Sequence, residues 1–193
     1  LVKSIVRETT GQDVASPFPR MSYDEAMERY GKDAPDTRFG LELSNCRDIL
    51  ITSSFNVFST ALASGGIIKC LPVPDEGVIS RKMIDDYTEY IKTFRAKGLP
   101  YFRFREGAFE GGIAKFLSDS ERVALTEKLA LNGNMLVFFA SDSEGVVNDT
   151  LANLRLKIGN DLNLIDENKF NFLWVLDFPL LEWDEESGRY YAM

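Results

Sequence analysis

Three glycines followed by a lysine invite comparison with a phosphate-binding loop: Gly107, Gly111, Gly112 and Lys115. In such a loop, backbone N–H groups and a lysine cradle the phosphates of a nucleotide. The Gly-Lys-Ser/Thr ending that completes the motif is missing here. Because a turn-rich loop before a capped helix explains the same glycines, we interpret them as structural and predict no cofactor-binding residue among them.

Two groups of carboxylates are candidates for Mg²⁺ ligands, Asp85 with Asp86 and Asp184 with Glu185 and Glu186. The pair is expected on the polar face of a helix and the triplet in a turn, where solvated charge is usual. The chain also contains no histidine, which excludes a Ser-His-Asp triad, a Cys-His dyad and every histidine-based zinc site within these residues. We therefore predict no catalytic and no metal-binding residue in the chain.

Arg103 and Arg105 share one face of a predicted strand with Tyr101, and such side chains can stack on RNA or contact its phosphates. The other interpretation is an ordinary exposed sheet face. A net charge of −8 favours the second interpretation, because the field that attracts nucleic acid is missing. Arg103 and Arg105 remain the candidate RNA contacts, and we expect the chain by itself to bind nucleic acid weakly or not at all.

The two cysteines, Cys46 and Cys70, have neither the spacing of a metal site nor that of a redox motif. We predict two small buried thiols in a reducing cytoplasm. The alternative is a disulfide between them.

The N-terminal half of the chain is expected to form one short helix and then two strands. Ser22 and Glu25 make a capping box that begins the helix, and Gly31 ends it. After a polar, proline-containing linker, β-branched and aromatic residues predict strands at residues 55–60 and 66–73.

Further elements follow from caps and periodicity. Ser80 caps a helix that ends at Gly98, and residues 101–105 alternate as a half-buried strand with Phe102 and Phe104 inward. A helix with a second capping box is predicted at residues 118–133, a short apolar strand at residues 135–140 and a third helix at residues 147–159. Residues 170–178 are almost continuously apolar, which predicts a strand buried on both faces in some larger sheet. A turn at residues 184–188 leads to a last strand from Tyr190.

These elements predict an α+β fold of two layers, with a roughly four-stranded, mainly antiparallel sheet and helices on one face. Hydrophobic residues make up 45% of the 193 positions, which is enough for a sizeable core. The longest apolar runs are far shorter than the ~20 residues that a membrane span needs, so we expect a soluble protein. Because the chain starts at Leu1, we expect a piece of a longer protein.

Several stretches resemble bacterial-type aspartyl-tRNA synthetases. Residues 17–31 (PFPRMSYDEAMERYG) and 36–38 (DTR) are similar to the segment after motif 2, and residues 174–180 (WVLDFPL) and 190–193 (YYAM) to the strands where the catalytic domain resumes. Between them, four short stretches resemble the GAD insertion domain: residues 61–66 (ALASGG), 80–82 (SRK), 96–99 (AKGL) and 113–117 (IAKFL).

The resemblance implies a parent class II ligase that joins aspartate to tRNA(Asp) through an aspartyl-adenylate, using ATP and Mg²⁺. It also implies a homodimeric, cytoplasmic parent. The motif 2 arginine, motif 3 and a histidine pair would all lie outside this chain, so no ligand residue of the family is carried over. The expected fragment binds no cofactor and is inactive. The alternative is a free-standing GAD-type RNA- or protein-interaction module, as in glutamyl-tRNA amidotransferase, without synthetase activity.

The resemblance also divides the chain. Residues 1–46 are expected to be catalytic-domain segment and linker, residues 47–142 the GAD domain, and residues 143–193 a helix and strands that return to the catalytic domain. Because an inserted domain leaves and rejoins its host at neighbouring points, the segments near Arg38 and Phe170 should lie close together. We expect residues 170–181 to pair with residues 190–193 as a hairpin and to bury their apolar side against the N-terminal piece or a second copy.

Overall fold

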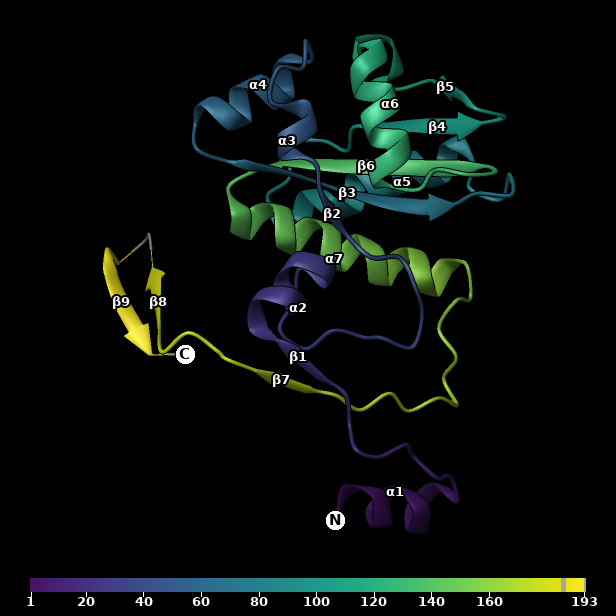
Figure 1. Cartoon of the computed structure of the whole chain (residues 1–193), viewed down its shortest axis with the longest axis vertical. Helices are drawn as coiled ribbons and strands as arrows, with labels where there is room; N and C mark the ends of the chain where they lie inside the picture. Colours follow the sequence, from purple (N-terminus) through teal and green to yellow (C-terminus); the bar gives the residue numbers. More distant parts are fainter. Residues whose placement is uncertain (185–186, 193) are drawn as a thin grey trace.

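The computed structural model describes residues 1–184 and 187–192. Its largest sheet has five strands in the order β2-β3-β6-β4-β5, and all neighbouring pairs are antiparallel (Figure 1). In sequence order the strands are β2 (Ser44–Asn45), β3 (Ile67–Pro74), β4 (Tyr101–Arg105), β5 (Ala108–Glu110) and β6 (Met135–Asp142). The α+β class and the antiparallel sheet are confirmed, with five strands in place of the predicted four.

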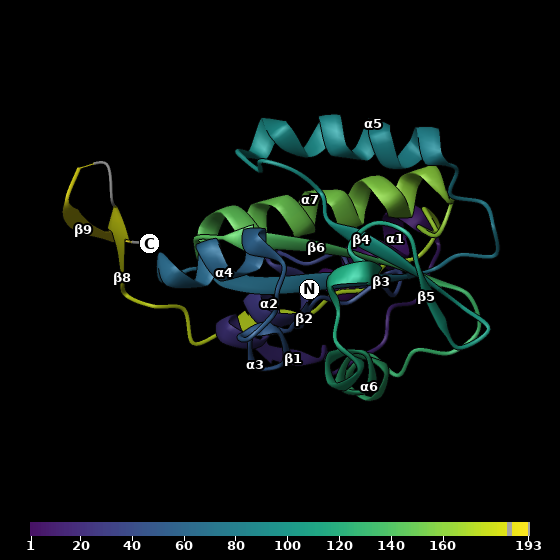
Figure 2. The ribbon, with the colours of Figure 1, turned by 90° about the horizontal axis from the view of Figure 1, so that it is seen from above.

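Helices cover both faces of this sheet. They are α3 (Arg47–Leu50), α4 (Asn56–Ala63), α5 (Arg81–Ile91), α6 (Asp119–Lys128) and α7 (Glu144–Asp161), with 3-10 turns η1 (Lys92–Phe94) and η2 (Ala114–Phe116). One core lies between the sheet and α5 with α7, and a second lies between the opposite face and α3, α4 and α6 (Figure 2).

The prediction of helices on one face is therefore wrong, and β6 shows why. Leu136 and Phe138 point into the first core, while Val137 and Phe139 point into the second, and all four are fully buried. A strand that is apolar at every position needs cover on both sides.

The strand predicted at residues 55–60 is also wrong, because this segment forms helix α4. Phe55, Phe58 and Leu62 pack into the second core, and their i, i+3, i+7 spacing is that of one helix face. Aromatic and β-branched composition favoured a strand, but the spacing of the buried positions decided the element.

Helix starts are predicted better than helix ends. The Ser118–Glu121 capping box is present, and the Ser80 hydroxyl accepts a hydrogen bond from the Met83 N–H. Of the predicted Ser22–Glu25 box, the bond from the Glu25 N–H to the Ser22 hydroxyl is present, whereas the Glu25 carboxylate pairs with Arg29. The helix expected to end at Gly98 stops earlier, where Arg95 takes up the left-handed conformation. The helix expected to end at Gly133 stops at Lys128, and the one expected to end at Gly159 continues to Asp161.

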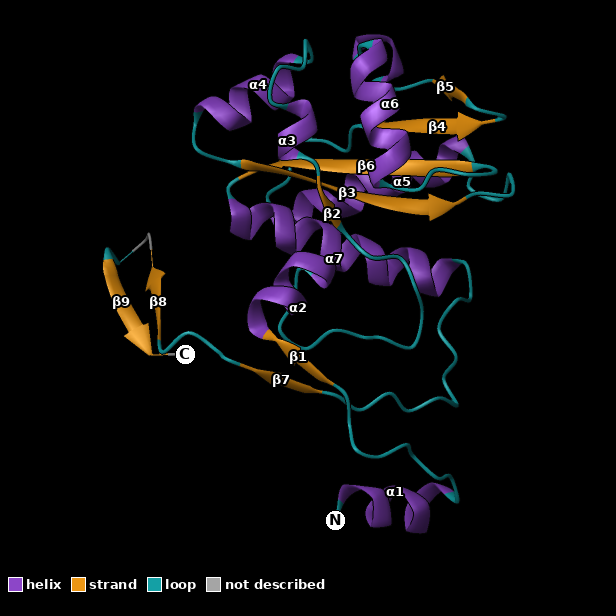
Figure 3. Ribbon diagram, in the orientation of Figure 1, coloured by secondary structure: helices purple, strands orange, loops and turns teal. Residues whose placement is uncertain are grey.

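The segments on either side of the sheet unit form a separate strand pair. β1 (Arg20–Ser22) and β7 (Trp174–Leu176) pair in parallel, with Met21 opposite Val175. α2 (Tyr23–Tyr30) follows β1 and lies between this pair and α7, and α1 (Val2–Thr10) is at the N-terminal end (Figure 3). The strand predicted over residues 170–178 is shorter than expected, because only Trp174–Leu176 are in β7. Trp174 and Leu176 are exposed, and among the described residues β7 pairs with β1 alone. Burial of this strand on both faces within a larger parent sheet stays a prediction.

The two crossings between the strand pair and the sheet unit run close to each other. The side-chain amide of Asn171 donates a hydrogen bond to the carbonyl of Thr37 at 2.8 Å, and the rings of Phe18 and Phe172 lie 5.4 Å apart. The expected closeness of the segments near Arg38 and Phe170 is confirmed.

The C-terminal hairpin consists of β8 (Leu181–Asp184) and β9 (Arg189–Ala192). Of the expected pairing between residues 170–181 and 190–193, only Leu181 with Ala192 is present, because residues 174–176 pair with β1. Glu185, Glu186 and Met193 lie outside the described residues. In the described part of the chain, no helix has the length and apolar character needed to cross a membrane.

Candidate functional site

The two candidate RNA contacts on β4 have different surroundings. The Arg103 guanidinium is ion-paired with the Asp75 carboxylate and also donates to the Ile79 carbonyl at 2.7 Å, which leaves its side chain 17% exposed. The Arg105 guanidinium lies 3.9 Å from the same carboxylate, and its side chain is 41% exposed. The expectation of a solvent-facing side for both arginines is therefore wrong for Arg103, and Arg105 is the more accessible of the two.

Asp75 holds the loop that covers this face of β4. Its carboxylate is buried and accepts hydrogen bonds from the backbone N–H groups of Gly77 and Ile79, each at 3.1 Å. A buried carboxylate with these donors and an arginine partner is a well-satisfied structural ion pair. Arg103 therefore holds the loop at residues 75–79 against the sheet through Asp75 and the Ile79 carbonyl.

The glycine-rich segment has a backbone role. Gly107 has a positive φ in the turn between β4 and β5, and Gly111 and Gly112 have φ of 66° and 45°. A Cβ at Gly112 would lie 1.9 Å from the Tyr101 carbonyl oxygen. The Lys115 ammonium lies over the Phe116 ring, 5.0 Å from its centre. These features are those of a turn-rich loop before helix α6, and the absence of a cofactor-binding role stays a prediction.

The carboxylates considered as metal ligands are paired with cations or fall outside the description. On the exposed face of α5, Asp85 pairs with Arg81 at 3.3 Å and Asp86 with Lys82 at 2.9 Å. Within residues 1–184 and 187–192, no cluster of three or more Cys, Asp or Glu side chains is arranged to hold a metal ion. Glu185, Glu186 and the side chain of Asp184 lie outside this description.

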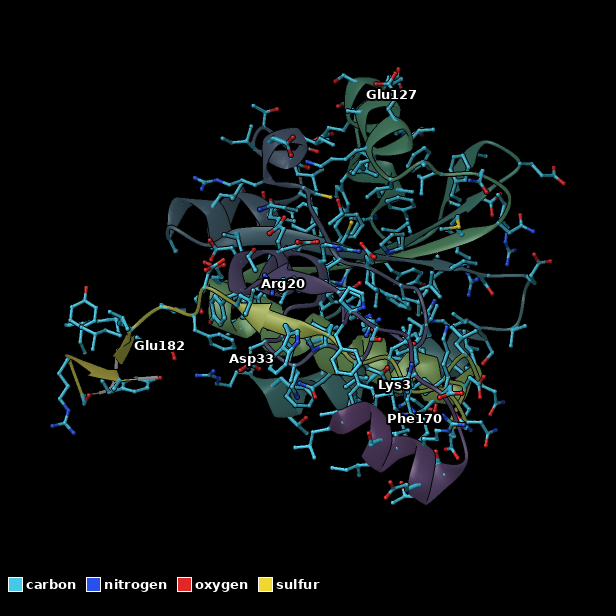
Figure 4. The ribbon with its side chains drawn as sticks, turned by 60° about the horizontal axis from the view of Figure 1, so that its bottom comes forward. Lys3, Arg20, Asp33, Glu127, Phe170 and Glu182 are labelled. Atoms are coloured by element: carbon cyan, nitrogen blue, oxygen red, sulfur yellow. The ribbon has the colours of Figure 1, made fainter. Side chains whose placement is uncertain are left out.

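Two of the hollows lie in different parts of the described structure. One, of about 490 Å³, lies between β5 and α6 and is lined by Arg122 together with the carboxylates of Asp119 and Glu127. The other, of about 310 Å³, is apolar apart from Arg20, Thr37 and Asn171 and lies beside β1 and the segment before β7. Figure 4 shows Arg20 and Phe170 on this second side, with Glu127 far from them. The lining of the hollow between β5 and α6 contains both positive and negative side chains, so it does not favour binding of an anion.

Cys46 and Cys70 are buried free thiols whose Sγ atoms lie 3.3 Å apart. Burial raises the pKa of the Cys70 thiol well above its ordinary value, and the hydrogen bond with Cys46 adds to this shift. The prediction of two buried thiols is confirmed.

We expect both thiols to be inert toward Ellman's reagent at pH 8 in the native chain and to react at once in urea. Because the folded pKa of Cys70 is raised, its contribution to stability is complete below about pH 8.5, the pKa of an unfolded thiol, and is lost as the pH rises toward the folded value. Urea unfolding at pH 7 and pH 10 measures this loss, and Cys70→Ala should show a smaller one. Rapid labelling without denaturant would contradict the buried pair.

Two buried cations were not singled out from the sequence. Lys69 is the one charged residue of the apolar strand β3, and Arg155 lies beside the apolar stripe of α7, four residues after Leu151. Burial lowers the pKa of the Arg155 guanidinium, while Tyr30 and Asp36 oppose that shift. For Lys69 the available signal was a lone charge inside a buried strand, since such a charge requires fixed partners. For Arg155 the signal was weaker, because α7 carries other charges and only its spacing from Leu151 indicated burial.

The chain is similar to known proteins over its whole length, and its middle part matches a domain family. Residues 58–151 match the GAD domain model. The whole chain is 50% identical to an aspartate–tRNA ligase of Halalkalibacterium halodurans and covers 33% of it. It is 49% identical over 97% of its length to an aspartate–tRNA(Asp/Asn) ligase of Geobacillus sp. (strain WCH70), of which it covers 32%, and 48% identical to that of Oleidesulfovibrio alaskensis, of which it covers 31%. The chain thus spans about a third of the length of these curated relatives, and the resemblance noted from its motifs is confirmed.

Proposed function

We propose that this chain is the insert-carrying third of an enzyme that attaches aspartate to tRNA(Asp) through an aspartyl-adenylate, with ATP and Mg²⁺ bound by other parts of that enzyme. By itself the chain is a non-catalytic fragment. A homodimeric parent and a cytoplasmic location belong to the same proposal. The similarity to aspartate–tRNA ligases extends through the flanks on both sides of residues 58–151, and this supports a ligase parent.

The parallel pairing of β1 with β7 is the observation that carries the proposal. These strands come from opposite sides of the sheet unit, yet Arg20, Met21 and Ser22 lie opposite Trp174, Val175 and Leu176. Such pairing is expected when an inserted domain leaves a host sheet and returns to it.

The insert in this proposal includes α7. The boundary expected between residues 142 and 143 falls directly before this helix, whose buried residues Val147, Leu151, Leu154 and Ile158 share a core with β3 and β6. We place the end of the GAD unit after α7 and its beginning near β2, because separating α7 from the sheet would expose this core.

The alternative is an interaction module without a synthetase parent. The GAD match alone fits both proposals, since it covers only residues 58–151. The ligase is favoured because the flanks outside that range are also similar to ligases.

A domain transplant tests the choice. The segment of the H. halodurans ligase that matches this chain is replaced by residues 1–193, and charging of tRNA(Asp) with aspartate is measured. We expect charging far above that of the same ligase with the segment deleted, and no aspartate-dependent exchange of pyrophosphate into ATP by the isolated chain. A chimera that folds, by circular dichroism and sedimentation, but does not charge tRNA would contradict the ligase proposal. Exchange by the isolated chain would contradict its non-catalytic role.

Any direct RNA contact of the insert is proposed to involve Arg105, with Arg103 behind it. We expect Arg105→Ala to reduce the salt slope of tRNA binding by about 1, the value for one lost phosphate contact. Arg103→Ala should instead lower the free energy of unfolding, because the buried Asp75 carboxylate loses its close cation and keeps only the more distant Arg105. Filter binding of tRNA to the chimeric ligase and to its Arg105→Ala variant, at several salt concentrations, measures the slope. An unchanged slope in the variant would show that the contact lies elsewhere.

A further inference from the structure

The Arg155 guanidinium on α7 is surrounded by backbone carbonyls of the linker that precedes β2. It donates hydrogen bonds to the carbonyls of Leu41 at 2.7 Å, Asp36 at 2.8 Å, Gly40 at 2.9 Å and Phe39 at 3.1 Å. The residue is 2% exposed. The bond to Leu41 comes from Nε and the other three from Nη2, so two nitrogens of the planar fork face the linker together, whereas an ammonium would have to donate from a single nitrogen.

Aromatic rings and a glycine complete the fit between the linker and α7. The guanidinium carbon lies 4.0 Å from the centre of the Phe39 ring and 4.9 Å from that of Tyr30. A Cβ at Gly159, one turn after Arg155, would lie 2.8 Å from the Phe39 ring. Phe39 therefore fills a notch on α7 that only glycine leaves open.

Lys69 makes a second connection from β3 to α2. Its side chain is 1% exposed, and its ammonium donates to the carbonyls of Met27 at 3.1 Å and Glu28 at 3.3 Å. It also pairs with the Glu28 carboxylate at 2.9 Å. These carbonyls belong to the last turn of α2, where a cation is favourable because the helix dipole is negative there.

Both cations come from the sheet unit, and the partners that hold them come from the flank and linker. A buried charge that loses its partners is strongly unfavourable, so each cation keeps its partners in place. A polar linker that contains Pro35 and Gly40 would otherwise leave the sheet unit free to swing relative to α2.

We propose that Arg155 and Lys69 are positioning residues that fix the orientation of the five-stranded sheet relative to α2 and the β1–β7 pair. The GAD unit is thereby held in one fixed orientation relative to these flanking elements. This inference concerns the chain itself and does not depend on the activity of any parent enzyme.

The test uses the full 193-residue chain, with amide hydrogen exchange and residual dipolar couplings as readouts. In Arg155→Met, amides of residues 36–43 and of α2 should exchange at least about tenfold faster, because several hydrogen bonds to a charged group are lost together. Amides of β3 and β6 should keep their rates. The couplings of the sheet and of the β1–β7 pair should fit one alignment tensor in the unchanged chain and two tensors of different magnitude in the variant.

Lys157→Met is the matched control, since Lys157 lies on the same helix and pairs with Asp161 at the surface. It should leave both readouts unchanged. Arg155→Lys keeps a charge but not the planar fork, so its amide exchange in residues 36–43 and α2 should lie between that of the unchanged chain and that of Arg155→Met. If Arg155→Met does not fold, Arg155→Lys and Lys69→Met provide the test with the same readouts. The proposal would be overturned if Arg155→Met, Arg155→Lys and Lys69→Met each fitted a single alignment tensor. It would also be overturned if amide exchange became faster to the same extent in β3, in β6 and in the linker.

Discussion

Gly112→Ala is expected to lower the free energy of unfolding by about 3 kcal/mol or more, because a side chain there conflicts with both φ and space. The new Cβ would lie 1.9 Å from the Tyr101 carbonyl oxygen at the start of β4. That oxygen accepts a hydrogen bond from the Ile113 N–H at 2.8 Å, and this bond would be lost if the backbone moved apart. Urea unfolding followed by circular dichroism measures the change.

Gly111→Ala is the matched control. Its φ of 66° is also left-handed, but a Cβ there meets nothing within 4 Å. We expect a cost of about 1–2 kcal/mol from the backbone conformation alone. Equal costs at the two positions would show that the approach to Tyr101 does not matter.

Phe138→Ala and Phe139→Ala are each expected to cost about 3–5 kcal/mol, the usual range for a buried phenylalanine. These neighbours on β6 are both fully buried, yet they lie in different cores. Phe138 meets Tyr87 of α5 edge-on, with ring centres 6.1 Å apart, whereas Phe139 lies 5.6 Å from Phe58 of α4. Thermal and urea unfolding measure both costs.

A sheet covered on one face would give a different result. One of the two substitutions would then remove an exposed ring and change stability by less than about 0.5 kcal/mol. Phe170→Ala provides a reference for a partly exposed ring, since Phe170 is 40% exposed. A small effect at either Phe138 or Phe139 would contradict the two-core description.

The strand at residues 101–105 and two helix starts could be predicted from local sequence because local interactions decide them. Ser80 and Ser118 cap their helices through hydrogen bonds three residues away, and residues 101–105 alternate as the burial of β4 does. The second layer of helices could also have been predicted. An unbroken apolar run at residues 135–140 indicates burial on both faces.

The surroundings of the candidate site depend on residues distant in sequence. Arg103 and Arg105 look equivalent in the sequence, but Asp75, 28 residues before Arg103, pairs closely with only one of them. The partners of Arg155 lie 114 to 119 residues away and are backbone carbonyls, which carry no side-chain signature. The sequence could have identified Lys69 and Arg155 as charges in buried elements, but not what they hold.

The parallel pairing of β1 with β7 is the most direct test of the inserted-domain account. In the isolated chain, nuclear Overhauser effects are expected between backbone protons of Met21 and Val175, in the register that also places Arg20 opposite Trp174. Slow amide exchange of β1 should accompany them. If the spectra show no contacts between these strands, or show residues 174–176 paired with another segment, the two flanks do not close into one host sheet and the account is contradicted.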